Sequence, residues 1–155
     1  MSNNLAKELS RMLTWLVAEM SFIILSEHPG ESLPAAYSQW ERASIEVQQP
    51  VTGVFTLAME SRLLQQITGA IYGLKIEEIT GEKQTDTLLE LVNTFAGRCL
   101  KIMVPVTTGF QLGLPMMSDE PVPDGQSTLN LVFCSDQGCL SLSLIGDKLI
   151  GGVMR

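Results

Sequence analysis

The segment from Thr85 or Asp86 to about Met103 constrains the fold most, because its apolar residues recur with the period of an α-helix. Pro105 follows it, and a proline cannot continue a helix. At 100° per residue, one side of this helix collects seven apolar residues: Leu88, Leu89, Val92, Phe95, Ala96, Cys99 and Met103. The segment therefore predicts a long amphipathic helix with one side buried against a core.

The first half of the chain predicts further helices and a pair of strands. Ser2 or Asn3 can cap a helix, and the apolar spacing extends this helix to Ser26. The prolines within residues 29–34 prevent it from continuing further. Residues 40–48 and 51–59 are rich in β-branched and aromatic side chains and predict adjacent strands. A shorter helix follows from Glu60 or Ser61 to Gly73, and residues 75–83 form a charged connector.

The second half predicts strands and loops. Residues 110–116 are expected to form a strand and residues 118–125, rich in Asp, Pro and Gly, a surface loop. Residues 127–134 and 139–145 flank a Ser-Asp-Gln-Gly turn and predict a β-hairpin. With 155 residues, the chain fits a single domain spanning 1–155. The order of elements predicts an α+β fold, with an antiparallel or mixed sheet packed against long helices.

The charge balance disfavours two classes of partner. Ten Lys and Arg against seventeen Asp and Glu give a formal net charge of −7, which repels nucleic acid and anionic lipid. The most apolar stretch, residues 12–25, contains Glu19 and is shorter than the roughly 20 residues of a membrane-spanning helix. We interpret it as a buried helix, with a weak signal-like segment as the alternative. We expect neither a nucleic-acid nor a membrane partner.

The cysteines and the single histidine predict no metal centre. Three cysteines leave one unpaired in any disulfide scheme, so reduced cytosolic thiols are the simplest expectation. Cys134 and Cys139 lie on facing strands of the predicted hairpin, as packing residues or as a solvent-facing pair, with no third or fourth zinc ligand in view. His28 is expected at the surface beside a helix end, where a cation suits the helix dipole.

The polar side of the 85–103 helix holds the candidate site. Asp86, Glu90, Asn93 and Gly97 line up along it, so a carboxylate and an amide project together. Gly97 costs the helix about 1 kcal/mol relative to alanine unless packing or close approach of another surface offsets it. The alternative is an ordinary solvated helix face, and spacing alone does not distinguish the two.

Residues 86–97, Asp-Thr-Leu-Leu-Glu-Leu-Val-Asn-Thr-Phe-Ala-Gly, resemble the signature helix of the CheC/CheX family of chemotaxis phosphatases, in which Glu-x-x-Asn carries the activity. Residues 53–59 and 110–115 resemble the strands that flank that helix, and the resemblance extends over roughly residues 51–145. Only one Glu-x-x-Asn is present, which is typical of the single-site CheX type. The resemblance implies a homodimer, and the reduced thiols expected above point to a cytoplasmic location.

The resemblance also implies a substrate and roles for the stripe. The substrate is the aspartyl phosphate of a CheY-like receiver domain, which supplies its own Mg²⁺ and a lysine, so this chain needs no bound cofactor. Asn93 is expected to orient the attacking water and Glu90 to dock on the receiver's lysine, while Asp86 and Gly97 contact the partner.

Two other interpretations remain open. One is a non-catalytic module of the same fold, like the middle domain of flagellar switch proteins, although these generally lack the Glu-x-x-Asn pair. The other is a structural dimer or adaptor in which the stripe is only solvated surface. Arg98 departs from the family pattern because it places a cation next to the stripe.

Overall fold

The structure, a computed structural model, describes residues 2–28, 39–118 and 128–151. Its centre is one antiparallel sheet of seven strands, arranged in the order β1-β6-β7-β3-β2-β4, with β5 also paired to β2. The strands are β1 (Ser26–Glu27), β2 (Trp40–Gln49), β3 (Gly53–Glu60), β4 (Gln111–Leu112), β5 (Met116–Met117), β6 (Thr128–Ser135) and β7 (Gly138–Ile145). The expected α+β fold is confirmed, and every strand pair described is antiparallel.

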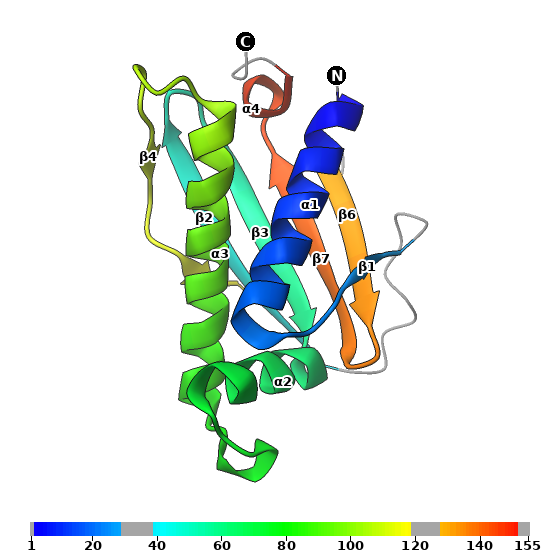
Figure 1. Cartoon of the computed structure of the whole chain (residues 1–155). Coiled ribbons are helices and arrows are strands. Elements are labelled where there is room, and N and C mark those ends of the chain that lie inside the picture. The colour runs from blue at the N-terminus through cyan, green and yellow to red at the C-terminus, as the bar shows by residue number, and fades with distance from the viewer. Residues whose placement is uncertain (1, 29–38, 119–127, 152–155) are drawn as a thin grey trace.

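The helices gather on one face of this sheet (Figure 1). Helices α1 (Ser2–Ser21) and α3 (Gly81–Met103) lie side by side across it, and α2 (Ser61–Tyr72) crosses at one end and contacts both. A 3₁₀ turn (Ile76–Glu78) leads into α3, and a short α4 (Asp147–Gly151), which the sequence patterns did not predict, follows β7. Among the described residues, no helix combines the length and apolar character needed to cross a membrane.

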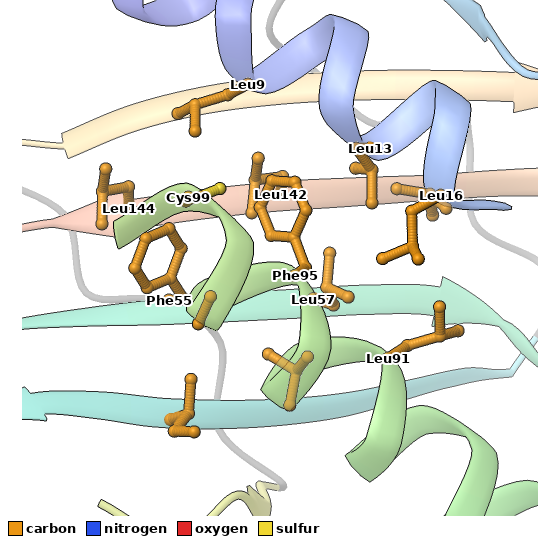
Figure 2. Close-up of a cluster of buried hydrophobic side chains, with 14 of the residues drawn as sticks. Leu9, Leu13, Leu16, Phe55, Leu57, Leu91, Phe95, Cys99, Leu142 and Leu144 are labelled. Atoms are coloured by element: carbon orange, nitrogen blue, oxygen red, sulfur yellow. The ribbon is translucent and has the colours of Figure 1, made fainter. Parts of the chain in front are cut away.

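A single apolar layer joins α1 and α3 to the sheet (Figure 2). Leu9, Leu13 and Leu16 of α1 point into it from one side, and Leu91, Phe95 and Cys99 of α3 from the other. They meet side chains of the two central strands, namely Phe55, Leu57, Leu142 and Leu144. The predicted apolar side of α3 is buried, except that Leu89 is half-buried, and Leu91 and Leu100 join it. This layer fixes both helices, so their outward faces are fixed as well.

Several predicted boundaries are confirmed within a few residues. The strands expected at 40–48 and 51–59 are β2 and β3, and the hairpin expected at 127–145 is β6 and β7. Helix α2 ends at Gly73, whose φ of 67° is left-handed and whose backbone N–H donates to the carbonyl of Gly69. Of the 118–125 loop only Ser118 lies within the described residues, and residues 29–34 lie outside them.

The first helix ends earlier than predicted. It stops at Ser21, not Ser26, and Phe22 turns the chain with a φ of 64°. The Ser21 hydroxyl donates to the Val17 carbonyl and accepts from the Ile23 backbone N–H, so local side-chain bonds replace the next helical turn. The chain then runs back to pair with β6 as β1. His28 accordingly follows an edge strand and not a helix end, and its backbone N–H donates to the carbonyl of Val132.

Two elements near the site also differ from expectation. Helix α3 begins at Gly81, inside the predicted charged connector, because the Thr80 hydroxyl caps it by accepting from the Lys83 backbone N–H at 3.2 Å. The strand predicted at 110–116 is two short strands, β4 and β5, which pair with β2 at separate points. Pro115 lies between them and has no N–H to donate.

The cysteines correct one expectation. Cys134 and Cys139 form a disulfide across the β6–β7 hairpin, where the register places them directly opposite one another, so they are not the reduced thiols that were expected. Cys99 remains a thiol, and its burial raises its pKa well above the usual value. Cys99 is therefore a packing residue in the core.

Candidate functional site

Helix α3 presents its polar stripe on the side away from the sheet. Asp86, Glu90 and Asn93 are exposed, and Gly97 is half-buried. Residues spaced three and four apart share one side of a helix, so the structure brings these four residues together in one line. The intervening residues on the other side of the helix are buried and hold this part of α3 against the core; they are Thr87, Leu88, Leu91 and Val92.

The Glu90 carboxylate has a neighbour that the sequence analysis missed. Thr94, one turn further along α3, donates its hydroxyl to Glu90 Oε1 at 3.0 Å. A carboxylate can accept several hydrogen bonds, so this contact restrains Glu90 while leaving it able to bind a cation. A hydroxyl four residues after a candidate carboxylate is the signal that could have predicted the pair.

Arg98 does not join the stripe. Its Nη2 lies 3.2 Å from Oε1 of Glu19 on α1, so the ion pair bridges the two helices. The cation that departed from the family pattern is therefore engaged with α1, beside the stripe. Both side chains remain partly exposed, and such surface pairs contribute only about 0–1 kcal/mol to stability.

Packing among the described residues does not require a glycine at position 97. A Cβ built at this position meets no heavy atom within 4 Å apart from its own helix backbone and neighbouring residues. A glycine inside a helix still costs about 1 kcal/mol relative to alanine. Because no described neighbour explains it, the open space above Gly97 fits the close approach of another molecule.

Chemically, the stripe offers two carboxylates, one carboxamide and a bare stretch of helix backbone. A carboxamide can hold and orient a water molecule but cannot act as a base near neutral pH. A carboxylate can form a charge-assisted bond to a lysine of a partner. In the described part of the chain, no three His, Cys, Asp or Glu side chains are grouped to hold a metal ion.

The structure is similar to solved structures of chemotaxis and flagellar proteins. Chemotaxis protein CheX from Vibrio vulnificus superposes with a TM-score of 0.74 at 15% identity, covering 92% of this chain and 98% of that one. CheX in the CheX-CheY-BeF3-Mg²⁺ complex from Borrelia burgdorferi gives 0.67 at 13% identity, covering 90% and 96%. The FliM middle domain from H. pylori gives 0.59 at 12% identity, covering 94% and 89%. At these identities the likeness shows the fold alone.

Sequence comparison identifies the family. Among curated proteins no sequence matches the chain. The model of the chemotaxis phosphatase CheX family matches residues 42–122, which is 81 of the 155 residues and runs from β2 through α3 to beyond β5. This chain therefore belongs to the CheX family of chemotaxis phosphatases.

Proposed function

We propose that this protein hydrolyses the aspartyl phosphate of a CheY-like receiver domain, with Asn93 and Glu90 as its two working side chains. The observation that carries the proposal is that Glu90 and Asn93 are exposed side by side on α3, whose opposite face is buried in the core. Gly97, one turn after Asn93, has open space above it. The CheX family assignment and the relative from Borrelia burgdorferi, which is in complex with CheY, support the choice of partner.

Hydrolysis of the aspartyl phosphate requires few catalytic groups from this chain. An aspartyl phosphate is an activated acyl phosphate, and the receiver is expected to hold Mg²⁺ and a lysine at its phosphoryl oxygens. Water attacks phosphorus, the bond from phosphorus to the aspartyl oxygen breaks, and the carboxylate leaves as aspartate. Asn93 accelerates this step by hydrogen-bonding the water in line with the leaving oxygen.

Glu90 fixes the docking register. Its carboxylate forms a charge-assisted hydrogen bond to the receiver's lysine, and the Thr94 hydroxyl restrains it for that contact. Asp86 lies one turn before Glu90 and extends the acidic end of the stripe. Gly97 lets the receiver approach the helix backbone. We propose further that the protein acts in the cytoplasm as a homodimer.

Two other functions compete with this one. The fold is shared with the FliM middle domain, so a non-catalytic binding module would have the same architecture. A structural dimer or adaptor would leave the stripe as solvated surface. The presence of both Glu90 and Asn93 favours the phosphatase over these two.

The test is loss of phosphate from phosphorylated candidate receivers, with Mg²⁺ present, followed with and without the protein. We expect Asn93→Ala to reduce the acceleration by about 100-fold or more, because misplacing a reacting group costs about that much. Asn4→Ala removes an exposed asparagine from α1 and serves as the matched control, with activity unchanged. Full activity in a folded Asn93→Ala variant would refute the mechanism.

A further inference from the structure

A pocket of about 310 Å³ lies at the C-terminal end of α3, where the polar stripe ends. Lys101 lines it from the last turn of the helix. The rest of the lining is mostly apolar and comes from the segment after the helix, namely Val104, Pro105, Val106, Gly109 and Phe110. Lys101 follows Gly97 by four residues, so it lies on the same side of α3 as the stripe. The stripe therefore leads into the pocket.

The wall that follows the helix is held in place by hydrogen bonds and by the core. The backbone N–H groups of Thr108 and Gly109 both donate to the Pro105 carbonyl, at 2.9 and 3.3 Å, and Gly109 turns the chain with a left-handed φ of 70°. Val104 is buried, and Phe110 packs against the core. The pocket is therefore preformed.

Apolar side chains near this pocket remain open to solvent. Val106, in its lining, is 94% exposed. The chain then runs back beside α3 through β4 and β5 (Figure 1), and Leu114 between these two strands is 84% exposed. Exposed apolar side chains grouped on one part of a surface mark an interaction site.

Lys101 adds a positive charge that has no partner in the described part of the chain. Its side chain is exposed, and the ion pairs found there are Glu8–Arg11 and Glu19–Arg98. A lysine also suits the negative end of a helix dipole, so its position alone does not identify a site. The preformed pocket beside it is the second, independent observation.

We propose that the receiver extends along α3 as far as this pocket, where it places an apolar side chain in the pocket and an adjacent carboxylate on Lys101. This docking mode rests on the proposed function, which places the phosphoryl group of the receiver at Glu90 and Asn93. It adds the direction in which the receiver lies and a contact that selects one receiver over another.

The usual size of a protein interface brings the pocket within reach of the receiver. A stable interface buries about 800 Å² on each partner, which corresponds to a disc about 16 Å in radius. Lys101 is eight residues beyond Asn93, or about 12 Å along the helix. A receiver centred on Asn93 therefore covers Lys101, but the lysine is too distant to touch the reacting phosphoryl group. Lys101 contributes to docking and not to the chemical step.

The charges along the stripe favour one direction of docking. Asp86 and Glu90 make its first half acidic, whereas Lys101 makes its end basic. A receiver that presents its lysine to Glu90 and a carboxylate to Lys101 meets opposite charges at both ends, and the reversed orientation meets like charges. The Mg²⁺ site of a receiver is built from carboxylates, so the surface around it is acidic. Because this chain carries −7 as a whole, Lys101 supplies a local attraction for that surface.

The test of the charged contact is steady-state phosphate release from the candidate receiver that the wild-type protein dephosphorylates fastest. We expect Lys101→Glu to raise KM about tenfold and to leave kcat unchanged. Lys148→Glu makes the same change of charge on α4, which packs against α1, β6 and β7, and should leave KM unaltered. In about 0.5 M NaCl the KM of Lys101→Glu should approach that of the wild type, because salt screens a charged contact but does not repair a folding defect.

Val106→Ser tests the apolar part of the contact. We expect KM to rise about 3- to 10-fold, because one buried methylene group contributes roughly the lower of these factors. Ile76→Ser is the matched control, since Ile76 is an exposed apolar residue at the opposite end of α3, and its KM should stay at the wild-type value. A larger rise in KM for Ile76→Ser than for Val106→Ser would place the receiver at the other end of the helix and overturn the proposal.

A receiver loaded with Mg²⁺ and beryllofluoride, a stable mimic of the phosphoryl group, separates this docking mode from the proposed function. Its binding, measured by calorimetry, should weaken in Lys101→Glu by the factor by which KM rises. If the wild-type protein releases phosphate while Lys101→Glu and Val106→Ser bind and react as the wild type does, this docking mode is refuted and the proposed function stands. A wild-type protein that neither binds nor dephosphorylates any receiver would overturn both.

Discussion

Helices α1 and α3 share a sheet face but differ in what they show to solvent. Both bury leucines in the same apolar layer, and the Glu19–Arg98 ion pair bridges them. On the outside, α3 presents Glu90 and Asn93, whereas α1 presents Trp15. The inner faces are set by the common core, so the outer faces are free to differ.

The two faces differ in what they expose to water. A polar face with a bare helix position at Gly97 suits a partner that docks, reacts and leaves. The α1 face leaves the apolar ring of Trp15 in water, although burying apolar area would contribute roughly 25 cal/mol per Å². The following predictions separate the two faces, beginning with the change that affects both.

Phe95→Ala should produce the largest effect because Phe95 lies in the layer beneath both helices. Its ring is fully buried and meets Phe55 edge to face, with ring centroids 6.0 Å apart. We expect the free energy of unfolding to fall by about 3–5 kcal/mol, measured by urea denaturation. A loss below about 1 kcal/mol would contradict a common core. Dimerisation and phosphatase activity should then decline together as the protein unfolds.

The sequence predicted this shared core because burial leaves a strong periodic signal. Most apolar positions of α3 were identified from spacing, β3 from its β-branched and aromatic residues, and β7 as one strand of the hairpin around the Ser-Asp-Gln-Gly turn. The predicted ends of helices were less accurate where a single side-chain hydrogen bond determines the end. Thr80 capping moved the start of α3 to Gly81, and the Ser21 hydroxyl helped to end α1 five residues early.

The two surfaces were not equally predictable. The Glu90-Asn93 stripe was found because it lies on one regular helix, and its proposed role came from resemblance to the CheX family. Thr94 was missed because a single side-chain rotamer decides its bond to Glu90. A pocket of about 660 Å³ beside Trp15 on α1 was also missed, because Ile24, which lines the pocket, was assigned to the helix. Its geometry depends on tertiary contacts that spacing does not encode.

Glu90→Ala should weaken receiver docking on α3 and leave the properties of α1 unchanged. Loss of a hydrogen bond to a charged group costs about 1.5–3 kcal/mol, so we expect KM for the phosphorylated receiver to rise about 10- to 100-fold. Receiver binding, measured by calorimetry, should weaken by a similar factor, while the molecular mass is unchanged. Glu8→Ala, on the α1 face, is the matched control and should leave KM unaltered. Unchanged receiver binding in Glu90→Ala would exclude the docking role.

Substitutions at Gly97 should move stability and docking in opposite directions. Gly97→Ala should raise the free energy of unfolding by up to about 1 kcal/mol, because a Cβ has open space there and alanine favours the helix. Gly97→Leu should keep part of that gain yet raise KM about tenfold, since its side chain occupies the space that the receiver needs. Thermal unfolding and steady-state kinetics on the same samples test both. A Gly97→Leu enzyme with normal KM would show that nothing approaches this position.

Thr94→Val should give the smallest effect, because it removes only the hydroxyl that restrains Glu90 and preserves the shape of the side chain. The hydroxyl only restrains Glu90 and makes no contact with the receiver itself, so the effect should be smaller than the loss of about 1.5–3 kcal/mol expected for Glu90→Ala, and we expect KM to rise a few-fold. The turnover number should stay near the wild-type value, because Asn93 still orients the water. Thr94→Ser retains the hydroxyl and should restore KM. A fall in kcat with normal KM would instead place Thr94 in the chemical step, and the division of the stripe into a docking carboxylate and a water-orienting amide would then fail.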